Sequence, residues 1–590
     1  MRINGNELYS YIVSGARNVI VNEQNLNRIN VFPVPDGDTG TNLALTMNSI
    51  LQGVEKVQDA NQMLDKVARV SIDNAYGNSG MIFAQYFIGW SKALESKTSI
   101  SPTELVESLK QAAQHAVDSV THPKEGTILT VMREWANHFE LPNEDDLETI
   151  FESSLVKLQD TVSKTKNQLK ILKDNNVVDA GAQAFYYFVE GIVRFIKNHS
   201  LDNLEFKAAS LDLITEPLLS VDVGEHRYCS QFLIKSDDSK ETIESLIHMH
   251  GDSLVINKND QHISIHVHTN DPHLVMKKLV ERGEVLSHKA DDMFLQANLI
   301  HNKKAKMAII TDSIADLPRD FMDQEHCVLL PLNIIIDSVV YMDKVTMKAE
   351  DFYQNLDDYH LNPSSSQVSP KVIERVFNQL LQNYDEVIGI FVSSKMSGTY
   401  NNIKKVVEKL NLDGKRVEII DSKNNSVTEG LLVREALLLK RQDKSFDEIV
   451  SHVKSMIPNL RIYVSVMDLK YMLRGGRVSK VTGFVLSKLK LQPVISIDKE
   501  GKGIIPFKSL SQKSAIKSIL KTIKKDMNES GIDSYALVYA DNPDDLNEFK
   551  LSVKSIIKKD PEYIETISPI VGLNAGKGAF AIGYIKKNKS

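Results

Sequence analysis

The sequence predicts a multidomain protein with an all-α first part, a small α+β middle part and an α/β last part. In the first 200 residues, apolar positions recur at intervals of three and four, which is typical of amphipathic helices. After residue 305, short β-branched runs alternate with helical segments, as in α/β folds. We therefore expect an all-helical domain at 1–200, a linker at 201–217, a middle domain at 218–302 and an α/β domain at 305–590.

Composition narrows the class of protein and its compartment. The net charge of −7 argues against a general nucleic-acid partner. Cys229 and Cys327 are the only cysteines, too few for a disulfide framework, which favours the reducing cytoplasm. The chain has no run of roughly 18 apolar residues and no apolar signal core at its N-terminus. We therefore expect no integral membrane segment, while transient membrane contact stays open.

Four polar loops in the first part each precede a predicted helix. They span 36–42, 74–80, 122–127 and 176–183 and combine glycine with hydroxyl, amide or carboxylate groups. A helix N-terminus presents unpaired N–H groups and the positive end of the helix dipole, so it favours anions. One such loop alone is ordinarily an N-cap, but four in one helical domain favour a phosphate site.

The first of these loops carries two carboxylates, Asp36 and Asp38. Carboxylates repel phosphates unless a cation lies between them, so the pair predicts bound Mg²⁺, with Asp179 as a third candidate ligand. No G-x-x-x-x-G-K-[ST] loop is present, since GLNAGKG at 572–578 lacks its spacing and hydroxyl. The site is therefore expected to belong to a nucleotide-binding lineage other than the P-loop proteins.

The same loops resemble a known family. NVFPVPDGDTGTN, GNSGMI, PKEGTILTV and VVDAGAQ, in this order, are similar to the nucleotide-binding domain of dihydroxyacetone kinases, and more closely to its relative in the bacterial fatty acid kinase. The resemblance implies a helical barrel with Mg-ATP at one mouth and Asp36 and Asp38 as catalytic metal ligands. The candidate ATP-binding residues are Asn30, Thr39, Gly40, Thr41, Asn42, Asn78, Ser79, Gly80, Gly126, Thr127, Asp179 and Gly181.

The middle part contains a candidate metal site. In ISIHVHT, at 263–269, strict alternation places the aliphatic residues on one face of a strand and His266 and His268 on the other, non-core face. With Cys229 from another predicted strand they form a ligand set that suits zinc and leaves a fourth position open. A solvated histidine pair is the alternative. The fatty acid kinase that this chain resembles has a middle domain with a similar cysteine and H-x-H strand that holds zinc, which implies Zn²⁺ here.

Three hydroxyl-rich turns stand at expected strand ends of the last part, at 311–318, 363–370 and 393–402. Such folds bind ligands at the carboxyl ends of their strands, although one serine turn alone is ordinarily a cap. Together with VSVMDLKYMLRGGRVSK, at 464–480, the turns resemble the DegV family of fatty-acid-binding proteins. This resemblance implies a two-lobed domain with a buried acyl tunnel and hydroxyls that hold the carboxylate. The candidate fatty-acid-binding residues are Ser365, Ser366, Ser397, Gly398, Thr399 and Asn574.

Two sequence features set the expected charge around the acyl head group. The family usually carries a histidine in a G-x-H-x-G-P-G loop, where this chain has Asn574, with Lys577 in the proline position. Asparagine donates a hydrogen bond but cannot become cationic, so Lys577 is a candidate for the missing charge. Arg474 and Arg477 form a compact basic loop, which is a candidate catalytic element that neutralises the carboxylate or an acyl phosphate; its alternative is a solvated turn.

These observations predict an ATP-dependent fatty acid kinase that forms an acyl phosphate for phospholipid synthesis. A carboxylate is already ionised at about pH 7, so the reaction needs charge neutralisation by Mg²⁺ and basic residues more than a general base. The alternatives are a dihydroxyacetone-type kinase and a non-catalytic lipid carrier or sensor regulated by nucleotide. Expected partners are the fatty acid, separate fatty-acid-binding proteins, an acyltransferase and a second copy in a homodimer.

Overall fold

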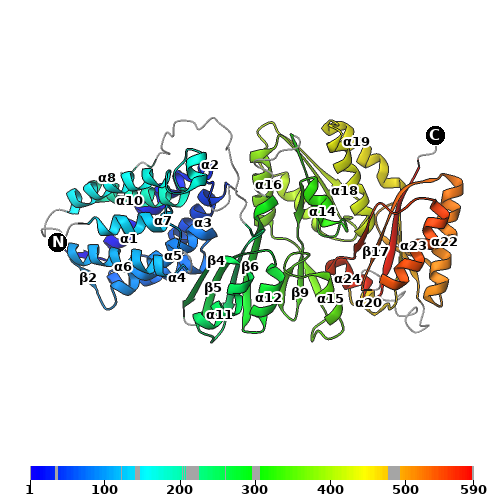
Figure 1. Ribbon diagram of the computed structural model, residues 1–590, viewed down its shortest axis with the longest axis horizontal. Helices are drawn as coiled ribbons and strands as arrows, with labels where there is room; N and C mark the ends of the chain where they lie inside the picture. The colour runs from blue at the N-terminus through cyan, green and yellow to red at the C-terminus, as the bar shows by residue number, and fades with distance from the viewer. Residues whose placement is uncertain are drawn as a thin grey trace. The chain divides into compact units, whose positions relative to one another are not determined.

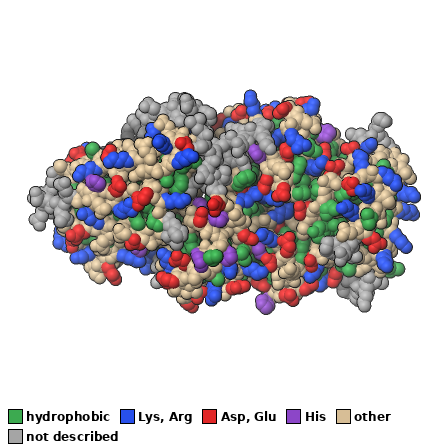
Figure 2. All heavy atoms as spheres, viewed as in Figure 1, with side chains coloured by type: hydrophobic (Ala, Val, Ile, Leu, Met, Phe, Trp, Pro, Cys, Tyr) green, Lys and Arg blue, Asp and Glu red, His purple; other side chains and the backbone are tan. Residues whose placement is uncertain are grey.

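The computed structural model describes residues 2–32, 37–120, 123–139, 147–201, 204, 206, 225–259, 261–295, 306–475, 492–541 and 543–587. The chain divides into two compact units, a first unit of residues 1–301 and a second unit of residues 302–590 (Figure 1). No helix in the described part of the chain is long and apolar enough to cross a membrane. Acidic and basic side chains are interspersed over the face drawn in Figure 2.

The first unit begins with packed helices, as the periodicity predicts. Their bounds are α1 Gly5–Val21, α2 Glu23–Arg28, α3 Thr39–Gly53, α4 Ala60–Asp73, α5 Gly77–Ala93, α6 Pro102–Asp118, α7 Ile128–Asn137, α8 Leu147–Thr165, α9 Lys170–Asp174 and α10 Ala180–Asn198, with short strands β1 Ile3–Asn4 and β2 Ser99–Ile100. Capping boxes start α1, at Asn4 and Glu7, and α6, at Ser101 and Glu104. Aromatic rings from α5, α7 and α10 pack edge to face in the core.

A small antiparallel sheet with two helices follows in the first unit. Its elements are β3 Tyr228–Lys235, α11 Lys240–Ile247, η1 His248–His250, β4 Asp252–Asn259, β5 His262–Thr269, α12 Pro272–Val280 and β6 Glu284–Asp292, with strand order β4-β5-β3-β6. Helices α11 and α12 pack against this middle sheet. Helix α5 also contacts it, since the Ser264 hydroxyl lies 3.9 Å from the Met81 sulfur. The helical part therefore covers a strand face that the sequence alone leaves open.

The second unit is an α/β structure, as predicted. Its described strands are β7 Met307–Asp312, β8 Cys327–Leu330, β9 Asn333–Ile336, β10 Val339–Met342, β11 Ser364–Ser366, β12 Glu386–Phe391, β13 Arg416–Asp421, β14 Leu460–Ser465, β15 Val494–Ile497, β16 Gly503–Phe507, β17 Ile532–Tyr539, β18 Ile564–Thr566 and β19 Phe580–Lys586. A parallel sheet, β13-β12-β7-β8, and a small sheet, β10-β9-β11, form the first lobe, residues 306–421. A mainly antiparallel sheet, β16-β15-β14-β19-β17-β18, forms the second lobe, residues 460–587.

Two helices of this unit join the lobes. The described helices are α14 Arg319–Gln324, α15 Ala349–Asn355, α16 Pro370–Asn383, α17 Thr399–Val407, α18 Ser426–Arg441, α19 Phe446–Met456, α20 Lys470–Gly475, α22 Gln512–Glu529, α23 Pro543–Ile557 and α24 Pro569–Ala575, with the short η2 Ile457–Asn459. Helix α18 contacts β7 and β12 of the first lobe as well as β17 and β19 of the second. Helix α24 follows β18 but contacts α15 and β9 of the first lobe (Figure 1).

Candidate nucleotide, metal and acyl sites

Polar loops of the helical part and the middle sheet line one pocket in the first unit. The pocket holds about 460 Å³ of empty space, part of it open to solvent. The sequence places the phosphate loops and the metal set in separate domains, and the structure brings residues of both to the same pocket. The lining residues are Asn30, Asp38, Thr39, Asn42, Gly77, Asn78, Ser79, Cys229, His268, Asp291 and Met293.

The loop before α3 places Asp38 at this pocket. The Thr39 hydroxyl hydrogen-bonds to the Asn30 side chain, which ties the two ends of the loop together. A Cβ at Gly40 would lie 2.1 Å from the Glu23 carbonyl oxygen, so only glycine lets α3 approach α2 this closely. Contacts of Thr39 and Gly40 therefore hold the start of α3 in place, and Asp38, Thr39 and Asn42 line the pocket.

Other predicted phosphate-site residues make internal contacts and are not among the lining residues. The Thr41 hydroxyl donates to Glu23 at 2.8 Å, and the Thr127 hydroxyl donates to the Lys124 carbonyl oxygen at 2.8 Å. Their contacts to a nucleotide stay predictions. The same holds for the glycines Gly80, Gly126 and Gly181.

Asp179, the third predicted magnesium ligand, caps α10. Its Oδ1 accepts the Ala182 N–H at 2.8 Å, and the residue is buried. Burial raises the pKa of Asp179 to about 6, against the lowering effect of backbone N–H groups that include those of Ala182 and Gly181. The observed role is that of an N-cap, and metal binding by this carboxylate stays a prediction.

Strand register explains how the candidate zinc ligands meet. Cys229 on β3 lies directly opposite His268 on β5, and Asp252 of β4 and Asp291 of β6 extend the same row across the middle sheet. His266 lies two residues along β5, on the same face. One ligand atom from each of Cys229, His266 and His268 lies within 4.8 Å of the others, and in the described chain only this set of side chains converges in this way.

Burial favours metal binding by both histidines. His266 and His268 are 0% and 5% exposed because the helical part covers a face predicted only to be non-core. Burial lowers the pKa of His268 to about 4 and that of His266 well below its ordinary value, so both imidazoles are neutral, the form that binds metals. His266 Nε2 is buried with no hydrogen-bond partner. A cysteine thiol and two neutral imidazoles, one with an unsatisfied nitrogen, fit zinc.

His268 also connects the middle sheet to the phosphate loops. Its Nε2 lies 3.3 Å from Asn78 Nδ2 at the start of α5, and its Nδ1 lies 3.7 Å from Asp252 Oδ1. Asn78, a predicted nucleotide-binding residue, therefore contacts a candidate metal ligand. Sequence reasoning missed Asp252 and Asp291, because only the register of strands far apart in the chain places them in this row.

The predicted acyl-site serines of the second unit lie on neighbouring segments. Ser365 and Ser366 are exposed on β11. The Ser397 hydroxyl is 2.8 Å from the hydroxyl of the first residue of α17. The two segments meet where Gln367 packs on Gly398, since a Cβ at this glycine would lie 2.1 Å from Gln367 Nε2. The arrangement clusters hydroxyls at one edge of the first lobe.

The remaining predicted acyl-site and catalytic residues, Asn574, Lys577 and Arg474, lie in different surroundings. Asn574, on α24, has a buried Oδ1 without a hydrogen-bond partner. Lys577 forms an ion pair with Asp541 at 3.1 Å, so its charge is already partly neutralised. Arg474 is exposed at the end of α20, 5.9 Å from the Tyr471 ring centroid. Two further predicted catalytic residues, Asp36 and Arg477, lie outside the described residues.

Comparisons with known proteins relate each part of the chain to a family. The model described as DAK2 domain matches residues 33–194, that of the middle domain of fatty acid kinase-like proteins matches 225–300, and that of the DegV family matches 306–587. A DegV domain-containing protein from Clostridium acetobutylicum is 33% identical over 284 residues, which are 48% of this chain and 99% of that protein. The chain belongs to the DegV family.

A further relative and two solved structures each match about half of this chain. An uncharacterized protein from Staphylococcus aureus is 30% identical over 348 residues, which are 53% of this chain and 62% of that protein. A fatty-acid-binding DegV family protein from Streptococcus agalactiae (28% identity) and DegV of Bacillus subtilis, a fatty-acid-binding protein (23% identity), each align with a TM-score of 0.44 over 48% of this chain and 100% of their own. The DAK2 and middle-domain matches support a kinase joined to the DegV domain.

Proposed function

We propose that the protein is an ATP-dependent fatty acid kinase. A carboxylate oxygen of the fatty acid attacks the γ-phosphorus of ATP, a new P–O bond forms, and the bond to the β–γ bridging oxygen breaks to release ADP. The observation that most supports this is the pocket in which Asp38 and Ser79 lie with Cys229 and His268. Predicted phosphate-binding residues and two of the three candidate metal ligands line one small space.

Charge is the main obstacle to this reaction, because two anions must meet. Asp36 and Asp38 would hold Mg²⁺, which neutralises the phosphates. Lys124 adds positive charge nearby, since after burial it is among the groups that lower the pKa of His268, whereas Lys289 is already paired with Asp291. A carboxylic acid with an ordinary pKa of about 4–5 is ionised at about pH 7, so no general base is required.

Cys229, His266 and His268 would hold Zn²⁺ at the same pocket. When bound, the ion would supply Lewis acidity toward a carboxylate or phosphate oxygen. Asp252 Oδ1, 3.7 Å from His268 Nδ1, lies next to that imidazole from outside the ligand set. Asn78 places an amide between the imidazole and the predicted phosphate site.

The DegV domain would hold the acyl chain while its carboxylate reacts. Each buried CH₂ favours binding by about 0.8 kcal/mol, so a long chain stays inside the protein while the head group is offered. Covalent fusion of the two parts raises the effective concentration of the acyl group at the kinase site. On this proposal the protein is a cytoplasmic homodimer that works with separate fatty-acid-binding proteins and an acyltransferase.

A hydroxylamine trap tests the proposed reaction. The purified full-length chain is incubated with Mg-ATP and either oleate or dihydroxyacetone, and hydroxamate and ADP are measured. We expect equal amounts of both products with oleate and neither above background with dihydroxyacetone. ADP formation with dihydroxyacetone alone would favour that kinase activity, and bound lipid without ADP would favour a carrier. Absence of hydroxamate with every fatty acid tried would overturn the proposal.

A further inference from the structure

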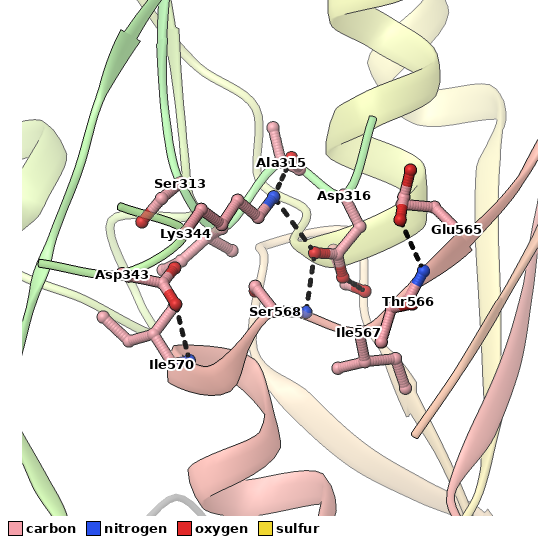
Figure 3. Close-up of polar contacts among 12 residues, drawn as sticks. Ser313, Ala315, Asp316, Asp343, Lys344, Glu565, Thr566, Ile567, Ser568 and Ile570 are labelled. Atoms are coloured by element: carbon pink, nitrogen blue, oxygen red, sulfur yellow. Dashed lines mark hydrogen bonds and ion pairs between the residues drawn. The ribbon is translucent and has the colours of Figure 1, made fainter. Parts of the chain in front are cut away.

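The N-terminus of helix α24, in the second lobe, donates hydrogen bonds to two carboxylates of the first lobe. The Ser568 N–H donates to Asp316 at 3.0 Å, and the Ile570 N–H donates to Asp343 at 3.3 Å (Figure 3). Ser568 is the N-cap of α24, but its own side chain does not cap the helix. The two carboxylates therefore accept N–H groups that the start of a helix leaves unpaired.

Asp316 also interacts with a hydroxyl and with an ammonium group outside α24. The Ser426 hydroxyl donates to it at 2.5 Å. Lys344 Nζ lies 3.4 Å from its Oδ1 while donating to the Ala315 carbonyl oxygen at 2.9 Å (Figure 3). Asp316 and Asp343 are both 0% exposed. We call this contact between the lobes, formed by Asp316, Asp343, Lys344, Ser568 and Ile570, the interlobe seam.

The rest of α24 also packs closely against neighbouring side chains. A Cβ at Gly572 would lie 2.4 Å from the Tyr353 hydroxyl, and a Cβ at Gly576, just after the helix, would lie 2.0 Å from the Tyr471 ring. Asn574 lies between these two glycines. Helix α24 has 7 residues, too few to be stable alone, so its tertiary contacts decide where Asn574 lies.

The interlobe seam is not built as a metal site. Asp343 Oδ2 and both carboxylate oxygens of nearby Glu429 are buried without a hydrogen-bond partner. Burial raises the pKa of Asp343 to about 7 and that of Glu429 well above its ordinary value. In the part of the chain that the structure describes, acidic side chains do not converge on an ion-sized space here. Lys344 and protons, rather than a metal ion, therefore offset this buried charge, and a neutral Asp343 still accepts the Ile570 N–H.

We propose that Asp316 and Asp343 are positioning residues for acyl recognition, because they hold the start of α24 and so fix Asn574, on the helix that contacts the strand next to the serine-bearing β11. The inference rests on the proposed binding of fatty acid by the DegV domain. Helix α24 contacts β9, the strand that pairs with Ser365 of β11. The Asn574 Oδ1 has no partner, and a rotation of the amide presents its N–H groups to a carboxylate instead.

A double-mutant cycle on the full-length chain tests this role, with oleate affinity measured by calorimetry. We expect Asn574→Ala and Asp316→Ala each to weaken binding by about tenfold, the effect of one hydrogen bond to a charged group. The double variant should bind oleate with the same affinity as the single variant that binds it less tightly, because Asp316 acts through Asn574. Losses that multiply in the double variant would overturn the proposal, as would wild-type affinity in Asp316→Ala.

Two further variants separate positioning from general stability. Asp526→Ala removes another buried carboxylate of the second lobe, one that is bonded to Tyr584 and Lys586 of β19 rather than to α24. It should lower Tm while leaving oleate affinity within about twofold of wild type. Asp343→Asn keeps an acceptor for the Ile570 N–H and should also stay within about twofold, whereas Asp343→Ala should lose about tenfold.

The outcomes distinguish this inference from the function on which it rests. If circular dichroism shows that Asp316→Ala does not fold, the comparison of Asp343→Asn with Asp343→Ala still tests the positioning role. Equal oleate affinity of Asp343→Asn and Asp343→Ala would overturn the positioning role. Failure of the wild-type chain to bind any fatty acid would overturn the proposed function as well, whereas wild-type binding with multiplied losses would overturn the positioning role alone.

Discussion

Two clusters of buried ionisable side chains, one in each unit, are built in different ways. In the first unit, Cys229, His266 and His268 bring ligand atoms together around one space, and His266 Nε2 has no partner. In the second unit, Asp316 and Asp343 accept backbone N–H groups of α24. Ligand atoms of three side chains that converge on one space are what a metal ion completes, whereas carboxylates that do not converge and that accept backbone N–H groups hold one part of the protein to another. The difference distinguishes a candidate metal site from the interlobe seam, which is a structural contact.

The largest effect should come from the first unit. We expect Asp38→Ala to lower ADP formation by about a thousandfold or more, because Mg²⁺ loses a ligand, while oleate affinity stays unchanged. Asp59→Ala, which removes the N-cap of α4, is the matched control and should cost only about 1 kcal/mol of stability. Loss of oleate binding in Asp38→Ala would contradict the assignment of chemistry and acyl binding to different units.

Removal of a metal ligand should have the next largest effect. Wild-type protein is expected to carry zinc by plasma mass spectrometry, and His266→Ala to lose it together with about a hundredfold in ADP formation. His248→Ala changes an exposed histidine outside the converging set and should keep both the zinc and the activity. Unchanged zinc content in His266→Ala would show that this set does not bind the ion, and the contrast between a metal site in the first unit and a structural contact in the second would then fail.

A smaller effect is expected at the hydroxyls of the second unit. Ser397→Ala should weaken oleate binding by about tenfold and slow ADP formation only at limiting oleate. The control is Ser369→Ala, which removes the N-cap of α16 and should leave oleate affinity unchanged. A fall in the rate at saturating oleate would place Ser397 in the chemistry instead.

The smallest effect concerns the pH dependence of stability. Burial raises the pKa of Asp343 to about 7, so the native state keeps a proton that the unfolded chain releases near about pH 4. The native state then binds more protons in this window, and this contribution to the free energy of unfolding falls as pH rises from about 4 to about 7 and then levels off.

Thermal unfolding of the second unit between about pH 5 and about pH 8 measures this contribution. Asp343→Asn lacks the titrating group, so its Tm should fall with pH less than that of wild type, by about a few degrees. Parallel pH profiles for the two proteins would show that Asp343 is ionised throughout and would weaken the distinction drawn between the units.

Local patterns in the sequence predicted the helical first part and the α/β last part, because helix and strand periodicity depend on near neighbours. Alternation also placed His266 and His268 on one face of a strand. It could not show that α5 covers that face, since this depends on packing between domains. The interlobe seam was equally hidden, because Asp316 and Ser568 are 252 residues apart.

The covered histidine face has a thermodynamic consequence. The set formed by Cys229, His266 and His268 lies on the face that also contacts α5 through Asn78. Two events that use one surface are reciprocally coupled, so any free energy that the packed helix adds to ion binding is added equally by the ion to the packing. If the set holds zinc as proposed, withdrawal of the ion by a chelator would therefore weaken the packing of the middle sheet against the helices.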